Sequence, residues 1–172
     1  FTDKDALLDA VCARYFEKLD EEMQAAAAGE PAPIDALRAQ GLAYVRFAMK
    51  TPELYRIATM GEGRPGSDVD LMLNNSAFVH ICSTVEALMA EGILPENDST
   101  TVALGLWTAA HGVAAMLISR PYLPWGDTEE FADRVLKAVV VGEIVSGAIG
   151  PATTPQDAVA TLKGLLDDEH RR

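Results

Sequence analysis

The sequence predicts an all-α protein, built as an orthogonal bundle of about seven helices. Apolar residues recur at spacings of three and four along most of the 172 residues, which is the period of a helix with one buried face. Prolines and glycines fall between these stretches, where helices begin and end. No stretch is predicted to be a strand, and no internal repeat is visible. A chain of this length can bury the core of one compact domain without a disulfide or a metal.

The first predicted helix covers residues 3–28, and its apolar residues form one wide stripe. Thr2 and Asp5 have the spacing of a capping box, and Gly29 follows the last helical turn. The stripe comprises Leu7, Leu8, Val11, Cys12, Tyr15, Phe16, Leu19 and Met23.

Two further helices are predicted over residues 35–50 and 52–60. Pro52 suits the first turn of the second, because proline has no N–H to lose there. Residues 61–66 then match GxGxxG, the glycine pattern of dinucleotide-binding loops. That pattern carries chemistry when a strand precedes it and a helix follows. Since a helix precedes it here, a loop between two helices is favoured.

The fourth predicted helix covers residues 68–91. Ser67 and Asp70 form a capping pair at its start, and Gly92 follows its end. Asn75 lies on its apolar stripe. Two interpretations of Asn75 stay open: its side chain reaches water or backbone at the edge of the stripe, or it supplies a polar contact in a mostly apolar pocket.

The fifth and sixth predicted helices, residues 99–119 and 128–148, lack a proper polar face. A membrane span over 99–119 is disfavoured, because threonine, glycine and alanine make the segment only weakly apolar. We therefore expect a homodimer in which both helices form a four-helix bundle across a two-fold axis. The interface residues predicted are Gly105, Gly112, Val140 and Ile144. A seventh, amphipathic helix is predicted to begin after Thr154.

Composition and motifs argue against several classes of protein. The formal net charge of −12 repels polyanions, so this chain should not hold DNA by itself. The two cysteines, Cys12 and Cys82, form no CxxC motif, and no histidine has the spacing of a preformed metal site. No nucleophile motif such as GxSxG occurs. We predict no enzyme, no metal and no cofactor.

Four segments carry a resemblance to a known family. They are Phe-Thr-Asp-Lys-Asp-Ala-Leu-Leu-Asp-Ala-Val at 1–11, Ala-Tyr-Val-Arg-Phe-Ala at 43–48, Pro-Glu-Leu-Tyr at 52–55, and Leu-Trp-Thr-Ala-Ala-His-Gly at 106–112. Together they resemble TetR-family transcription regulators whose C-terminal domain is of the Trp-His-Gly type. The resemblance spans most of the chain and ends near Gly150.

The resemblance implies a cytoplasmic repressor, with no membrane association, that binds operator DNA as a dimer through an N-terminal helix-turn-helix. Residues 1–150 would be its effector-binding and dimerisation domain, with residues 1–11 joining it to the DNA-binding helices. Residues 151–172 are expected to pack on the same domain. Because the chain begins at Phe1 without a signal-peptide pattern, we expect its start to be a cut within a longer protein. Lys4 corresponds to a lysine that contacts a DNA phosphate in the family.

The expected effector is a small, mostly apolar molecule held between the helices of one subunit. Its candidate contacts lie on the inward stripes, and a strongly anionic ligand is disfavoured because no lysine or arginine is among them. For Trp107 and His111, an ordinary core position remains an alternative. A different class, a helical scaffold or partner-binding protein, would have a solid core instead of a cavity. The candidate contacts are Phe16, Tyr44, Phe47, Tyr55, Met72, Asn75, Phe78, Val79, Cys82, Trp107 and His111.

Overall fold

The computed structural model describes residues 3–60, 76–150 and 154–169, together with the side chains up to residue 164. Within these ranges every regular element is a helix, so the all-α fold class is confirmed. The helices are α1 (Lys4–Ala27), α2 (Pro33–Lys50), α3 (Pro52–Thr59), α4 (Ser76–Ala90), α5 (Ser99–Ser119), α6 (Thr128–Ile149) and α7 (Pro155–Glu169). Residues 61–66, with their glycine pattern, and the predicted start of the fourth helix lie outside the described residues.

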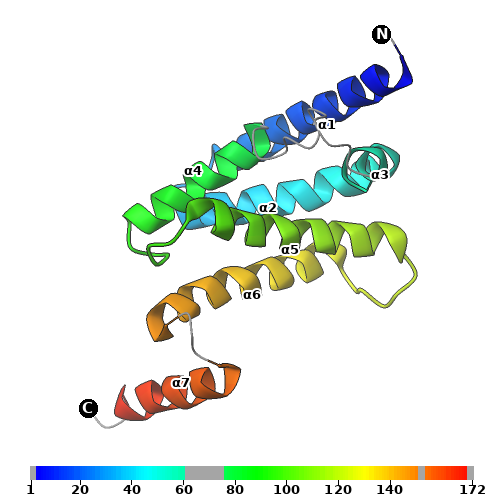
Figure 1. The fold of residues 1–172 in the computed structure, drawn as a ribbon. Coiled ribbons are helices and arrows are strands. Elements are labelled where there is room, and N and C mark those ends of the chain that lie inside the picture. The colour runs from blue at the N-terminus through cyan, green and yellow to red at the C-terminus, as the bar shows by residue number, and fades with distance from the viewer. Residues whose placement is uncertain (1–2, 61–75, 151–153, 170–172) are drawn as a thin grey trace.

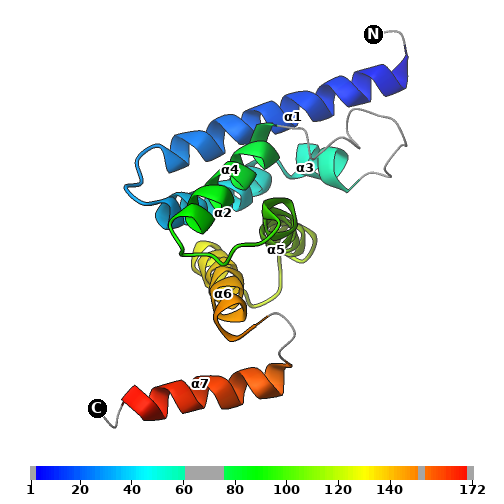
Figure 2. The same cartoon turned by 60° about the vertical axis from the view of Figure 1, so that its left-hand side comes forward.

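Helix α2 is the centre of the bundle. It packs against α1, α3, α4, α5 and α6 (Figures 1 and 2). On one side of α2 lies α1, and α4 contacts both of them. On the other side lie α5 and α6, which pack on α2 and on each other. In Figure 1, α1, α2, α5 and α6 therefore follow one another from top to bottom.

Aspartates begin three of the helices. The side chain of Asp3 accepts a hydrogen bond from the backbone N–H of Ala6, so the cap of α1 is Asp3 and not Thr2 as predicted. Asp98 caps α5 in the same way, and the hydrogen bonds from Thr101 lower the pKa of its carboxyl. Asp127 caps α6 by accepting from two backbone N–H groups. Each cap satisfies donors that a helix start leaves unpaired.

Helix α2 begins two residues earlier than predicted. Pro33 is its first residue. Proline fits the first turn because its fixed φ is already helical and it has no N–H to leave unpaired. Pro33 therefore starts α2, five residues after Ala28, the C-cap of α1.

The core runs along the inner faces of α1, α2, α4 and α5. From the stripe predicted on α1, Cys12, Tyr15, Phe16, Leu19 and Met23 are buried. Leu7, also placed on that stripe, is 46% exposed, because the first turns of α1 project beyond the other helices (Figure 2).

The C-terminal end of α6 packs closely on the loop between α4 and α5. A Cβ atom built on Gly147 would lie 2.3 Å from Cγ of Pro95. Any side chain at position 147 would therefore collide with a rigid ring. Elsewhere α6 is thinly covered, since only Ala132 and Leu136 on it are buried.

Helix α7 stands apart from the other six (Figures 1 and 2). Its first turn is capped by Thr154, whose hydroxyl accepts from the backbone N–H of Asp157, as predicted. The packing of residues 151–172 on the same domain stays a prediction. On the part of its apolar face whose side chains are described, Val159 is 52% exposed and Leu162 is 38% exposed.

Helix α5 is the described helix that is long and apolar enough to cross a membrane by length and composition alone. Within its most apolar window, 39% of the residues are buried in the fold. Helices α2, α4 and α6 pack against it. Because these three helices cover α5, the structure supports the prediction of a buried core helix over that of a membrane span.

Candidate ligand-binding site

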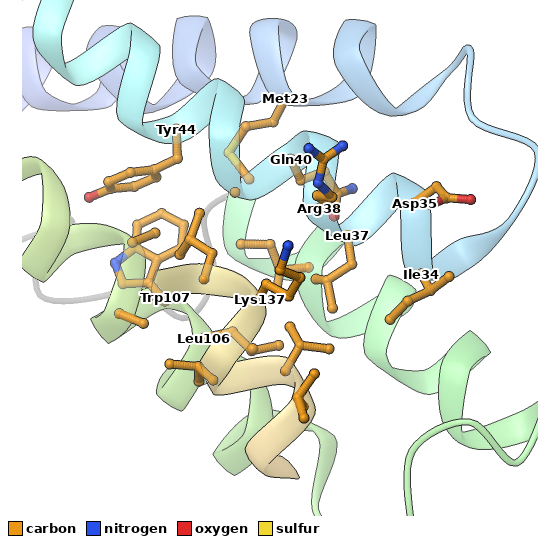
Figure 3. Close-up of a pocket in the computed structure, with 18 of the residues that line it drawn as sticks. Met23, Ile34, Asp35, Leu37, Arg38, Gln40, Tyr44, Leu106, Trp107 and Lys137 are labelled. Carbon is orange, nitrogen blue, oxygen red and sulfur yellow. The ribbon is translucent and has the colours of Figure 1, made fainter. Parts of the chain in front are cut away.

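A cavity of about 290 Å³ lies between α2, α5 and α6 (Figure 3). Its wall is almost wholly apolar. The residues of the wall are Met23, Ile34, Asp35, Leu37, Arg38, Gln40, Gly41, Tyr44, Ile81, Leu106, Trp107, Ala109, Ala110, Leu136, Lys137, Val139, Val140, Val141 and Ile144. We refer to this space as the apolar cavity.

Two local patterns in the sequence produce this wall. On α2, residues 37, 40 and 44 are spaced by three and four, so they share the inward face of the helix. On α6, three consecutive valines at 139–141 present stiff β-branched side chains around one turn. The small side chains of Ala109 and Ala110 on α5 leave the space between α2, α5 and α6 unfilled.

Gln40 is the buried polar residue of this wall. It is 2% exposed, and its Oε1 atom has no hydrogen-bond partner among the described residues. The sequence analysis did not select it. The signal was present, because a lone glutamine falls on the same stripe as Leu37 and Tyr44.

Charged side chains lie at the edge of the cavity. The Nε atom of Arg38 on α2 lies 2.5 Å from Oδ1 of Asp133 on α6, and this hydrogen bond lowers the pKa of the Asp133 carboxyl. Lys137 is 3.8 Å from the other oxygen of the same carboxylate and is largely exposed. Arg38, Lys137 and Asp35 are all part of the wall (Figure 3). Since the sequence analysis named no basic residue at the site, Arg38 and Lys137 are additions to it.

Tyr44, Tyr55 and His111 form a hydrogen-bonded group behind the cavity. The hydroxyl of Tyr44 lies 3.3 Å from Nδ1 of His111, and that of Tyr55 lies 2.9 Å from the same atom. Tyr55 also donates to the carbonyl oxygen of His111, at 3.0 Å. Burial lowers the pKa of His111 and raises that of Tyr55 to about 12. Burial favours the neutral imidazole, and its Nδ1 atom makes the contacts with both tyrosine hydroxyls.

Seven of the predicted ligand contacts fall into three sets in the structure. Tyr44 and Trp107 line the apolar cavity. Phe16, Phe47 and Phe78 are core residues; the rings of Phe16 and Phe78 pack on Trp107, and that of Phe47 packs on Tyr15. Tyr55 and His111 belong to the hydrogen-bonded group behind the cavity.

Four predicted contacts remain. Val79 is 46% exposed, so it does not lie on an inward stripe as expected. Cys82 is partly buried against the core, and burial raises the pKa of its thiol. Met72 and Asn75 lie outside the described residues.

The predicted interface residues fall in two places. Val140 and Ile144 form part of the cavity wall and are partly buried in the monomer. Gly105 and Gly112 are exposed on α5, and no atom of the monomer comes within 4 Å of a Cβ built on Gly112. Lys4, the predicted phosphate contact, is exposed at the first turn of α1. Among the described residues, no group of three or more His, Cys, Asp or Glu side chains is placed to hold a metal ion.

Comparisons with known proteins give a family and a shared fold. Residues 37–139, more than half of the chain, match the family described as "Tetracyclin repressor-like, C-terminal domain". A solved structure from Rhodococcus sp. RHA1, described as a protein with unknown function, superposes with a TM-score of 0.73 at 23% identity. The superposition covers 84% of this chain and 75% of that one, and it shows a shared fold. No curated protein matches the sequence.

Proposed function

This chain belongs to the tetracyclin repressor-like C-terminal domain family, and we propose that it is the effector-binding and dimerisation domain of a transcription repressor. The observation that carries the proposal is the apolar cavity, of about 290 Å³, which lies between helices of one subunit. Ligand sites in proteins are mostly apolar hollows of about this size or larger, with a few polar groups. A scaffold protein would have no need of such a space.

The cavity sets the size and character of the effector. An engineered cavity of about 150 Å³ holds benzene, so this one has room for roughly twelve non-hydrogen atoms. Its wall favours a molecule that is mostly hydrocarbon. The ion pair of Arg38 with Asp133 keeps the charges at its edge in balance, which disfavours a strongly anionic ligand.

The exposed face of α5 supports dimerisation. It carries a stripe of uncharged residues along residues 101–116, all exposed in the monomer: Thr101, Leu104, Gly105, Thr108, Gly112 and Met116. Leu104 is 41% and Met116 is 45% exposed. The centres of protein interfaces are depleted in charge in this way, and glycines let two helices approach closely. In the proposed homodimer, α5 and α6 of both subunits form a four-helix bundle.

Helix α1 would carry the signal to DNA. In the proposed repressor a helix-turn-helix precedes α1, and Lys4 at its start contacts a phosphate of the operator. The same helix reaches the cavity through Met23. In this proposal α1 has two placements, one that suits DNA binding and one that suits DNA release. Effector binding alters the affinity for DNA if the effector has a different affinity for each placement.

The test of this proposal is blockage of the cavity. Ala109→Leu adds three carbon atoms to the wall, whereas Ala138→Leu adds the same atoms at an exposed position of α6 outside the wall. Uncharged apolar compounds of six to about twelve non-hydrogen atoms would be screened by thermal shift and by Trp107 fluorescence, with Trp125→Phe as background. We expect compounds that bind the native domain and Ala138→Leu but not Ala109→Leu. Binding that is equal in all three proteins, or absent from all, would contradict the proposed site.

A further inference from the structure

Gln40 is placed where an apolar residue would be expected. It follows Leu37 by one turn and precedes Tyr44 by one turn on the buried face of α2, and it is 2% exposed. Leucine would fill a similar volume without a polar atom. The carbonyl oxygen of Gln40, Oε1, instead has no partner among the described residues. A buried acceptor without a donor destabilises the fold by the loss of its hydration.

Three other polar side chains of the wall are already engaged or lie at its edge. The hydroxyl of Tyr44 is directed to His111 at 3.3 Å, and Arg38 is paired with Asp133. Lys137 is largely exposed. Among the buried side chains described in this wall, Gln40 is therefore the one whose polar atom lacks a partner.

From this placement we infer that the effector is a neutral, mostly hydrocarbon molecule with one hydroxyl group, which donates a hydrogen bond to Oε1 of Gln40. The terminal torsion of glutamine is broad, so the carboxamide can turn toward the cavity without leaving a staggered side-chain conformation. A carboxylate in this position would set one acceptor against another and lose its own hydration. The inference rests on the proposed function, because it assumes that the apolar cavity is the effector site.

Gln24 on α1 provides a matched control. Its Nε2 atom is also buried without a partner among the described residues. Together with Gln40 it lines a second hollow, between α1, α2 and α4, but Gln24 is not part of the apolar cavity. Gln24→Leu thus removes a comparable amide from the neighbouring helix and leaves the wall of the cavity unchanged.

The experiment compares two isomers, 1-octanol and 1-methoxyheptane, which have the same atoms but differ in that the ether cannot donate a hydrogen bond. The measured quantity is the ratio of their dissociation constants. When this ratio is compared between variants, the difference in hydration of the two free probes cancels. Calorimetry and Trp107 fluorescence would give both constants in the native protein, Gln40→Leu, Gln40→Met and Gln24→Leu. Sodium octanoate serves as the charged probe.

We expect the preference for the alcohol to fall by roughly 3- to 10-fold in Gln40→Leu and Gln40→Met, as for the loss of one hydrogen bond, and to stay at the native value in Gln24→Leu. Octanoate should bind more weakly than either isomer. If both isomers bind and their ratio is the same in the native and Gln40 variants, this inference is wrong while the proposed cavity stands. A Gln24 variant that changes the ratio as much as the Gln40 variants, or tighter binding of octanoate, overturns it as well. If neither isomer binds the native protein, the proposed site fails together with the inference.

Discussion

The hydroxyl group of Tyr55 on α3 lies 2.9 Å from Nδ1 of His111 on α5 and 3.0 Å from the carbonyl oxygen of the same residue. Tyr55 is fully buried. Helix α3 has only eight residues, and a helix of that length depends on tertiary contacts for its stability. These hydrogen bonds therefore help to hold α3 against the core.

Tyr55→Phe should lower the free energy of unfolding by about 1–3 kcal/mol, because it removes a buried hydroxyl that contacts both Nδ1 and the carbonyl oxygen of His111. Chemical denaturation would measure the change. Tyr122→Phe is the matched control, since Tyr122 is 99% exposed, and it should leave the stability unchanged. Equal stability of the two variants would show that the contact contributes nothing.

The buried imidazole of His111 predicts loss of stability in acid. Burial lowers its pKa in the folded state below the ordinary value, so the unfolded chain binds the proton more readily. The stabilising contribution is then fully present above the unfolded pKa, about 6.5, and declines as the pH falls through that value toward the lower pKa of the folded state. Unfolding measured from pH 8 to pH 5 should show a decline that is smaller in His111→Gln. An unchanged pH dependence in that variant would remove His111 as its cause.

The sequence predicted the helices well because each carries its own local signals. The proline of α3, the aspartates before α5 and α6, and the apolar period of α1 all act within a few residues of one another. The candidate site was harder to predict. An inward stripe identifies a side chain that faces the interior, but it does not distinguish a residue packed against others, such as Phe78, from one that borders a space, such as Trp107.

The contribution of α6 to the cavity shows the same limit. Val140 and Ile144 were predicted at a subunit interface because α6 lacks a polar face, yet they also line the apolar cavity. Which of two buried environments an apolar side chain meets depends on contacts between residues far apart in the chain. The ion pair of Arg38 with Asp133, 95 residues apart, could not be predicted from sequence for that reason.

Leu104→Glu should separate the proposed dimer. Leu104 is 41% exposed on the uncharged stripe of α5 and is not part of the cavity, whereas a change at Val140 would affect cavity and interface together. Burying a carboxylate opposite its symmetry mate is unfavourable, so light scattering should give the mass of one chain for the variant and of two for the native protein. Met49→Glu, on an exposed site of α2, should stay dimeric. A native protein with the mass of a single chain would disprove the dimer.

Gly147→Ala should destabilise the end of α6. The added methyl would lie 2.3 Å from Cγ of Pro95, and a proline ring cannot rotate away, so α6 or the α4–α5 loop must move. Overpacking of this kind costs about 1–3 kcal/mol. Gly142→Ala on the same helix meets nothing within 4 Å and should gain up to about 1 kcal/mol from helix propensity. Thermal unfolding would compare them, and a stabilised Gly147→Ala would contradict the close approach.

Gln40→Leu should raise the stability of the protein without ligand. The native carboxamide has a buried oxygen with no partner among the described residues, and its replacement by an apolar group of similar volume removes that unfavourable burial. The expected gain in the free energy of unfolding is about 1 kcal/mol, measured by denaturation without added compound. Ala109→Leu, which changes the wall but no polar atom, shows how much of any gain comes from filling the cavity alone. A residue kept for binding commonly lowers stability in this way. If Gln40→Leu is instead destabilised by more than about 1 kcal/mol, the carboxamide has a partner in the folded protein, and its oxygen is not free to receive an effector.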